Sequence, residues 1–364
     1  MKQVSFLKEQ HDVVTAGFGP SPFADVPHEE IAEGPLFRWG LIGRLLNIAF
    51  LVMRWYAPLA SINALDKATV KQLKPREWDV VIAHDVKALD AALALAPKRG
   101  VVVDLHEYAP RQEEHSALWR LLIAPYFRWM CRKKATQAAA VVTVSQGIAD
   151  EYRSQFGFDS TLVVNATPYA ELQPRVVKTP IRLVHSGRVA VQRRLDIMIQ
   201  GVRDSSANVT LDLYLVGDES PEMDKLRSLA ADDPRIRFRE PVPYPKLVKT
   251  LNTYDVGLSI FPPTTFNLAW CLPNKFFDFV QARLGVIVGP SPEMARFVDQ
   301  YKIGLVLPDF DPSSLATALD SLTPHGVAQW KATSHSHATA LSSESQSAIW
   351  EDLMARLLER EDGL

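Results

Sequence analysis

The sequence predicts an α/β protein with two doubly wound parallel-sheet domains. Three observations support this fold class. Short strand-like runs alternate with helical patterns along the chain, one proline-rich stretch interrupts the alternation, and a length of 364 residues suits two domains. Strands and helices that alternate in this way form a parallel sheet with helices on both faces.

The first half of the chain carries five short runs rich in valine and other strand-forming residues. They are Val13–Gly17, Asp79–His84, Val101–Leu105, Val141–Val144 and Thr161–Val164. The stretch Ala166–Pro180 then breaks the alternation and holds three prolines, so we place a hinge at residues 169–180. The first domain is therefore expected to span residues 1–168.

The second half repeats the alternation with six further strand-like runs. They are Ile181–Ser186, Leu211–Val216, Ile236–Arg239, Asp255–Phe261, Val286–Gly289 and Gly304–Leu307. Several of the helical patterns between them open on a proline, whose missing N–H costs nothing in a first helical turn. The patterns are Arg194–Val202, Pro221–Ala230, Tyr244–Thr253, Pro273–Ala282, Pro292–Gln300 and Pro312–Leu322. We expect a second domain over residues 181–340 and a C-terminal helix within 341–364.

The composition excludes several classes of protein. Lys plus Arg total 40 and Asp plus Glu total 42, a net charge of −2, so we expect no nucleic-acid partner. Cys131 and Cys271 lie far apart and outside any metal-binding motif, which favours a reducing cytoplasm. Residues 1–12 carry no apolar core, and no window of 20 residues is free of charge. We therefore expect neither a signal peptide nor a membrane-spanning helix.

Two segments of the first half are both apolar and basic. Residues 36–56 hold three arginines and no acid among Leu, Ile, Phe and Trp, and residues 118–134 hold five basic residues and no acid. Wide apolar faces with Trp and Arg suit the interface of an anionic membrane. Burial against the first sheet or against another subunit is the alternative.

Ligands of open α/β sheets bind beyond the carboxyl ends of the strands, and one strand end of the second half is basic. Gly187 closes a strand, and Arg188 and Arg193 follow on the loop to the next helix. Two guanidinium groups there suit a diphosphate, whose oxygens accept bidentate hydrogen bonds. Because Arg194 adds another charge, a solvated basic helix start is the alternative.

The segment Leu272–Asp278 (LPNKFFD) opens a helix after an irregular loop. A helix N-terminus offers free N–H groups and the positive end of its dipole to an anion. Asp278 lies about one helical turn beyond Asn274. Its carboxylate is placed either to accept hydrogen bonds from a ribose or simply to favour the helix dipole.

Other strand ends are weaker candidates. His106 follows a first-half strand, where an imidazole can hydrogen-bond a sugar or carry a proton, although a single His is more often structural. Gly217 follows another strand and permits either close backbone approach or a plain turn. Asp309 and Asp311 have the spacing of a metal–diphosphate site, but they precede a helix and suit its cap, so we expect no metal there.

Taken in order, these motifs resemble a known family. The second half reads Gly187-Arg188-x4-Arg193, then LYLVGD, YDVGLSIFPP, LPNKFFDF and GLVLPDFDP, and the first half reads HDVVTAGFG, DLHEY, VVTVSQGIADEY and TLVVNATPY. This order is similar to that of the group 1 (family 4) glycosyltransferases, which have two Rossmann-like domains facing a cleft (the GT-B fold). The resemblance covers nearly the whole chain. Its specificity lies in order and spacing rather than in any single motif.

The resemblance implies a retaining, metal-independent, hexosyltransferase-type reaction that uses a nucleotide-diphosphate sugar as donor and no cofactor. It implies a glycan or lipid-linked acceptor in cell-surface polysaccharide synthesis, at the inner face of the membrane. Closure of the two domains about the hinge would exclude water from the donor.

The resemblance also implies roles for the site residues. Arg188 and Arg193 hold the diphosphate beside Gly187 and Gly217, Arg193 standing where the family usually has Lys. Amides near Leu272 and Asn274 face the phosphates, and Lys275 adds charge. Asp278, shorter than the usual Glu, binds the ribose, and His106 lies near the transferred sugar. His106, Arg188 and Arg193 are thus the expected catalytic residues.

Two features depart from the family. Trp270 stands where a Glu usually contacts the donor sugar, so Asn267 or Thr265 would have to supply that contact. The family's first strand and its glycine-rich turn are also absent before Val13, and we expect the true start codon to lie upstream. A rearranged sheet or a covering partner are the alternatives. These departures keep two other functions open: a nucleotide-sugar epimerase of the same architecture and a non-catalytic subunit.

Overall fold

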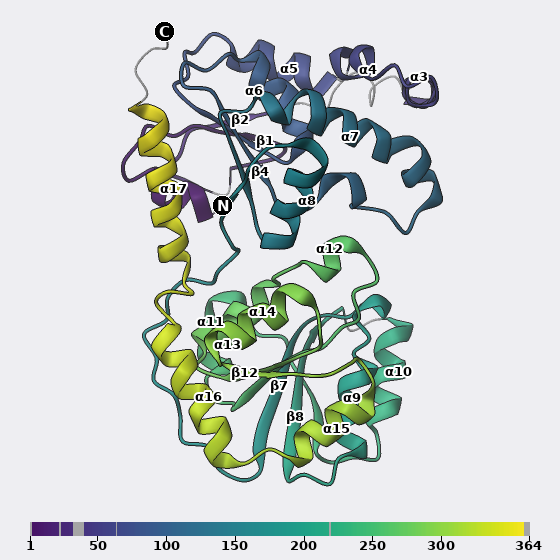
Figure 1. Ribbon diagram of the computed structural model, residues 1–364, viewed down its shortest axis with the longest axis vertical. Coiled ribbons are helices and arrows are strands. Elements are labelled where there is room, and N and C mark those ends of the chain that lie inside the picture. Colours follow the sequence, from purple (N-terminus) through teal and green to yellow (C-terminus); the bar gives the residue numbers. More distant parts are fainter. Residues whose placement is uncertain (1, 22, 32–39, 63, 218–219, 360–364) are drawn as a thin grey trace. The chain divides into compact units, whose positions relative to one another are not determined.

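The computed structural model describes residues 2–21, 23–31, 40–62, 64–217 and 220–359. The chain divides into two compact units, Met1–Val164 with Ser347–Leu364, and Asn165–Gln346. Each unit has parallel strands and surrounding helices, which confirms the predicted fold class (Figure 1). The units meet after Val164, earlier than the boundary that the prolines indicate.

Residues 165–180 belong to the second unit because hydrogen bonds hold them there. The Ala170 N–H donates to Oε1 of Gln281 at 3.1 Å, and Arg283 Nη2 donates to the Ala170 carbonyl oxygen at 2.6 Å. The expected hinge at 169–180 is therefore anchored at its first residues. Domain closure about this segment stays a prediction.

The C-terminal helix α17 (Ser343–Leu358) lies where a helix was expected, within residues 341–364. Its residues from Ser347 onward belong to the first unit. The reason is an apolar face that packs against the first sheet and buries Trp350, Leu353, Met354 and Leu357. Residues 360–364 of the expected helix lie outside the described residues.

The first unit contains two parallel sheets. β1 (Thr15–Gly17) pairs with β2 (His28–Glu30), and a four-stranded sheet has the order β3-β4-β5-β6. Its strands are β3 (Val81–His84), β4 (Val101–Leu105), β5 (Ala140–Thr143) and β6 (Thr161–Leu162). Every residue of β4 is buried, which explains its run of valines.

The sheet of the first unit is divided between β1 and β3. Residues of both strands line a cavity of about 840 Å³, together with side chains such as Leu7 and Trp78. Each of these two strands pairs with one neighbour only in the part of the chain that is described. The division agrees with the expectation that this domain lacks a strand of its sheet.

Besides α17, the described part of the first unit contains several further helices. They are α1 (Lys2–Leu7), α3 (Gly40–Val52), α4 (Tyr56–Ile62), α5 (Ala64–Leu73), α6 (Leu89–Ala94), α7 (Ala124–Lys133) and α8 (Gln146–Phe156). Short helical turns complete the unit: η1 (Val86–Ala88), η2 (Ala109–Arg111), η3 (Trp119–Ile123) and η4 (Ala135–Gln137).

The second unit contains one six-stranded parallel sheet with the order β12-β11-β10-β7-β8-β9. The strands are β7 (Ile181–Arg188), β8 (Val209–Val216), β9 (Ile236–Arg239), β10 (Val256–Ser259), β11 (Gly285–Val288) and β12 (Gly304–Val306). The chain runs outward from β7 to β8 and β9, and then returns to β10 on the other side of β7. The carboxyl ends of β7 and β10 therefore flank the point where the strand order reverses, where open α/β sheets bind their ligands.

Helices cover both faces of this sheet (Figure 1). On one side lie α9 (Asp196–Asp204), α10 (Pro221–Ala230) and α15 (Pro312–Asp320), and on the other α11 (Tyr244–Leu251), α13 (Asn274–Gln281), α14 (Pro292–Tyr301) and α16 (Pro324–His337). Two short pieces, η5 (Val191–Arg193) and α12 (Phe266–Ala269), precede α9 and α13. The Asp311 carboxylate accepts a hydrogen bond from the Ser313 N–H at the start of α15, which confirms the predicted cap.

Candidate functional site

Arg193 lies close to the point of strand-order reversal in the second unit. It ends η5, just beyond β7, and its guanidinium carbon is 4.9 Å from the ring centroid of Phe261, which follows β10. Its Nη1 atom is buried and has no hydrogen-bond partner among the described residues. Because a buried guanidinium nitrogen is costly to leave unpaired, this donor suits an anionic ligand.

Lys275 reaches the same place from the first turn of α13. Its Nζ atom lies 3.2 Å from Nε2 of His185, whose Nδ1 is 2.8 Å from the Leu258 carbonyl oxygen. Since a carbonyl only accepts, Nδ1 carries the proton of the neutral ring, and Nε2 accepts from the lysine. Burial, followed by the charge of Lys275, holds the pKa of His185 well below its usual range. The histidine thus serves as a neutral support for the ammonium.

The charge of Lys275 is itself easily lost. Burial, followed by the nearby charge of Arg193, lowers the pKa of Lys275 to about 7. A bound anion would stabilise the ammonium form and reverse this shift. Arg193 and Lys275 therefore form a cationic site, and the charge on Lys275 depends on whether an anion is bound.

Two glycines allow these elements to approach one another. A Cβ atom on Gly187 would lie 2.7 Å from Nζ of Lys275, and a Cβ on Gly257 of β10 would lie 2.3 Å from the ring of Phe279 on α13. The second contact sets α13 close against the sheet, and the first leaves room for the lysine above β7. Sequence reasoning identified Gly187 but gave no role to Gly257 or His185.

The N-terminus of α13 lies next to these cations. The helix begins at Asn274 after Pro273, and no side chain of the described residues caps it. Leu272 is buried and Asn274 is exposed. The structure thus brings together Gly187, Arg193, Lys275 and the opening of α13, and the binding of a diphosphate there stays a prediction.

Two other candidates of the second unit, Arg188 and Gly217, lie at the ends of β7 and β8. Arg188 ends β7 with an exposed side chain, directly after Gly187. Gly217 has φ +96° with open space around a virtual Cβ, so the backbone conformation alone explains it. Asp218, the next residue of that motif, lies outside the described residues.

Asp278 is more buried than its expected role suggests. Its side chain is 3% exposed, and its Oδ1 accepts hydrogen bonds from Thr167 at 2.6 Å and from Tyr244 at 3.4 Å. The carboxylate therefore links α13 to the segment that follows the first unit. A contact between Asp278 and a ribose stays a prediction, and it would require the ribose to reach the buried carboxylate.

Trp270 and the residues just before it form and cap the short helix α12. Trp270 directly follows α12, and its ring centroid lies 6.4 Å from that of Phe266. The Thr265 hydroxyl caps the same short helix by accepting from the Leu268 N–H, and Asn267 is buried. The loop of residues 261–270 holds no acidic residue that could take the place of the family's glutamate.

A cluster at the strand ends of the first unit includes His106. Nε2 of His106, just beyond β4, lies 3.3 Å from Oδ2 of Asp104, and Nδ1 of His84 at the end of β3 lies 3.4 Å from the same oxygen. The sequence placed His84 at the end of a predicted strand. It did not show that β3 pairs with β4 and so brings His84 next to Asp104.

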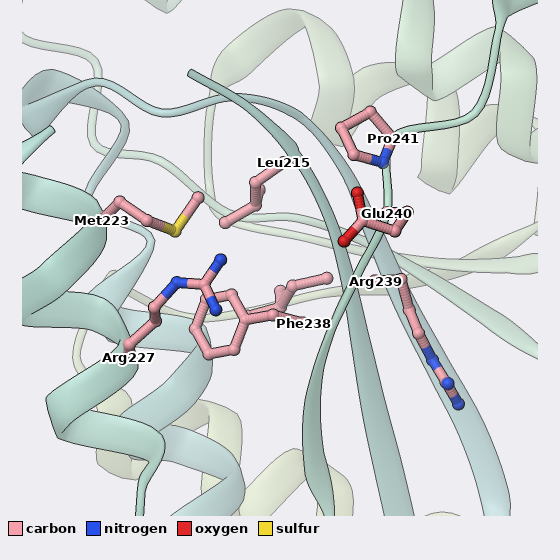
Figure 2. Close-up of a pocket in the computed structure, with 8 residues that line it drawn as sticks. Leu215, Met223, Arg227, Phe238, Arg239, Glu240 and Pro241 are labelled. Atoms are coloured by element: carbon pink, nitrogen blue, oxygen red, sulfur yellow. The ribbon is translucent and has the colours of Figure 1, made fainter. Parts of the chain in front are cut away.

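A small cavity at the ends of β8 and β9 does not suit a nucleotide. Figure 2 shows the guanidinium of Arg227 over the ring of Phe238, at 5.1 Å from its centroid, beside Met223 and Leu215. The cavity volume is about 20 Å³. That space holds about one water molecule, so the cluster around Arg193 remains the candidate site.

Sequence comparison finds one family match and one short match to a curated protein. Residues 6–166 match the family described as Glycosyltransferase Family 4. A segment of 59 residues is 42% identical to the succinoglycan biosynthesis protein ExoL of Rhizobium meliloti (strain 1021). That segment covers 16% of this chain and only 15% of ExoL.

Solved structures share the fold of the chain. HepE (Alr3699) of Anabaena, in complex with UDP and glucose, has a TM-score of 0.68 at 13% identity and covers 98% of this chain and 95% of its own. Sucrose-phosphate synthase of Thermosynechococcus elongatus also has a TM-score of 0.68, at 12% identity, with 99% and 92% covered. TarM has a TM-score of 0.63 at 13% identity, and the chain spans 59% of its length. These likenesses confirm the predicted GT-B fold.

Proposed function

Because residues 6–166 match the model of glycosyltransferase family 4, we propose that the chain transfers a sugar from a nucleotide-diphosphate donor to a glycan or lipid-linked acceptor. The observation that supports this most is the meeting of Arg193, Lys275 and the uncapped start of α13 where the strand order reverses. The UDP complex of HepE, which has the same fold, supports the class of donor.

The chemistry of such a site follows from its charges. When the bond from the sugar to the diphosphate breaks, negative charge develops on the leaving phosphate and positive character on the sugar ring. Fixed cations and helix N–H groups stabilise that negative charge without rearranging. We therefore propose a metal-independent reaction without a cofactor, and the family resemblance favours retention of configuration at the anomeric carbon.

The test of this function is an incubation of the purified protein with UDP-, GDP- and TDP-sugars, with and without an undecaprenyl-phosphate-linked glycan extract. Acceptor-dependent release of nucleoside diphosphate is the expected result. An epimerase would convert a nucleotide sugar without any acceptor. Failure of all three nucleotides to bind in calorimetry would contradict the transferase.

A non-catalytic subunit is the second candidate, and Trp270 favours it. An indole at this position cannot accept the hydrogen bonds that a carboxylate accepts from sugar hydroxyls. This candidate predicts that Trp270→Glu creates or raises donor turnover, whereas an adapted active enzyme loses activity with the same change. The measurement is nucleotide release by both proteins at equal concentration.

We also propose that the first unit contacts an anionic membrane surface, at the leaflet that faces the cytoplasm. In α3 only Gly43 is buried, and its large apolar side chains are mostly exposed. Leu41 is 73% exposed, and Leu121 of the neighbouring η3 is 68% exposed. Residues 36–39 of the predicted segment lie outside the described residues. No helix in the described part of the chain is long and apolar enough to cross a bilayer.

Arginines accompany this apolar surface. Arg44, Arg54 and Arg120 are all exposed on or next to α3 and η3. Exposed leucines that insert at an interface, flanked by guanidinium groups, bind anionic lipid through both apolar burial and charge. α3 holds no acidic residue, and several of its leucines and isoleucines are exposed side by side, which is unusual for a helix that faces water.

Replacing Leu41, Leu45 and Leu121 together with serine is expected to reduce vesicle binding by roughly tenfold or more, because each leucine contributes apolar burial. The measurement is flotation with phosphatidylglycerol-containing vesicles. The control is Val176→Ser, which changes a residue that is 76% exposed in the second unit. Vesicle binding that changes neither with the content of anionic lipid nor with the salt concentration would contradict the proposed contact.

A further inference from the structure

Two histidines and an aspartate meet at the ends of two neighbouring strands of the first unit. β3 and β4 pair in parallel with His84 opposite Asp104, and His106 lies two residues beyond Asp104, just after β4. His84 Nδ1 and His106 Nε2 lie 3.4 Å and 3.3 Å from the same oxygen, Oδ2 of Asp104. One nitrogen of each ring and one carboxylate oxygen thus lie within 4.8 Å of one another.

The distances from the carboxylate oxygen to the two nitrogens suit a shared metal ion better than direct ion pairs. A hydrogen bond between a cationic N–H and a carboxylate is about 2.7–2.9 Å long, shorter than either distance. Tetrahedral zinc, with bonds of about 2.0–2.2 Å to imidazole nitrogen and carboxylate oxygen, places neighbouring ligand atoms about 3.3–3.5 Å apart. An octahedral ion with bonds of about 2.0–2.1 Å places them only about 2.9 Å apart. The observed 3.3 Å and 3.4 Å match the tetrahedral arrangement.

The carboxylate of Asp104 is held in place and lacks a basic partner. Asp104 is 2% exposed, and its Oδ2 also accepts a hydrogen bond from Nε2 of Gln3 at 2.8 Å. Such a hydrogen bond to a ligating carboxylate is typical of the second shell of a metal site. No lysine or arginine of the described residues pairs with Asp104. Because a buried carboxylate is costly without a positive charge beside it, its surroundings favour a bound cation.

Further acidic groups lie next to these three residues. Asp85, directly after His84, has a φ of +69°, and its Oδ1 atom is buried without a hydrogen-bond partner among the described residues. The pKa of Glu107, directly after His106, is raised first by partial burial and then by the charge of Asp85. The negative potential of these carboxylates favours a divalent cation over an uncharged ligand at this edge of the sheet.

From these observations we propose that His84, Asp104 and His106 bind a zinc ion, with water as the fourth ligand. Two imidazoles, one carboxylate and one water are a known ligand set of zinc. The side chains of His84 and His106 are 48% and 38% exposed, so an ion can reach them and the rings can turn towards it. This site is independent of the proposed function, and no step of the proposed sugar transfer passes through it.

The first test is a calorimetric titration of the full-length protein, without a histidine tag and stripped of metal by a chelator, with zinc chloride. We expect one zinc ion to bind per chain. His84→Ala and His106→Ala each remove one ligand from an accessible position and should weaken binding by more than about 100-fold, since loss of a second-shell partner alone costs about 10–100-fold. Gln3→Leu removes such a partner and should weaken binding by about tenfold.

The matched control is His115→Ala. Nε2 of the exposed His115 lies 3.3 Å from Oε2 of Glu113, the same separation as in the proposed site, but this pair has no third ligand among the described residues. We expect His115→Ala to bind zinc as the wild type does. Equal losses of zinc binding in His115→Ala and His84→Ala would show that zinc binds histidine–carboxylate pairs in general, and would overturn the proposed site.

The second test replaces zinc with cobalt(II), because tetrahedral cobalt(II) absorbs visible light far more strongly than octahedral cobalt(II) does. We expect a strong absorption that saturates at one equivalent, disappears when zinc is added, and is missing in His84→Ala. A wild-type protein that binds no zinc, or that binds cobalt(II) with an octahedral spectrum, would overturn the inference. Neither measurement uses donor or acceptor, so a protein that binds zinc but transfers no sugar contradicts the proposed function alone.

Discussion

Replacing Arg193 with alanine is expected to lower kcat/KM for sugar transfer by about 10²–10³-fold, equivalent to about 2.7–4 kcal/mol, the range for loss of one donor that stabilises developing negative charge. The guanidinium has a buried nitrogen without a protein partner and lies over Phe261, so its charge is held in place and poorly screened. Arg188→Ala is also expected to weaken binding of the diphosphate, and its exposed side chain predicts the smaller loss.

Calorimetry with paired ligands separates a phosphate contact from general damage. Arg193→Ala should weaken binding of the nucleoside diphosphate far more than binding of the free nucleoside. The matched control is Arg194→Ala, since the neighbouring arginine is exposed and pairs with Asp196 at 2.9 Å. Equal losses for both ligands would show that Arg193 does not touch phosphate.

Nucleoside diphosphate binding is expected to weaken above pH 7, by up to about tenfold per pH unit, because Lys275 must regain a proton. The pKa of Lys275 in the free protein is lowered to about 7, first by burial and then by Arg193. A bound diphosphate favours the ammonium and raises this pKa. Binding therefore takes up a proton above pH 7 and takes up none well below it.

Lys275→Met tests the origin of that pH dependence. The variant should bind weakly at every pH but lose the decline above pH 7 and the accompanying proton uptake. Proton uptake is measured by calorimetry in two buffers with different ionisation enthalpies. An unchanged pH profile in Lys275→Met would assign the dependence to another group.

The strands and helices of the second unit were predictable because strand-like runs alternate regularly with helical patterns, several of which open on a proline. The β7 run of Ile181–Ser186 and the helix after Pro273 both appear where the sequence indicates. In the first unit the short strand β2 was missed, because its residues His28–Glu30 are polar and lack the alternation of a buried strand.

The site was predictable only in part, because its contacts join residues far apart in the chain. Gly187 and Lys275 were named from separate motifs, but their close approach depends on His185 and Gly257, whose roles require strand order and packing. The burial of Asp278 under Thr167 likewise follows from where residues 165–180 lie, which no local pattern shows. Helix α17 was predicted as a helix, but an apolar helix face does not identify the sheet that it covers.

The central claim is that Arg193, Lys275 and the start of α13 bind a pyrophosphate, and a crystal structure of the protein with UDP, GDP or TDP tests it most directly. We predict phosphate oxygens within hydrogen-bond distance of Arg193 Nη1 and Lys275 Nζ, above Gly187. A nucleotide whose phosphates lie elsewhere on the second unit, with these two side chains still facing protein alone, would contradict it.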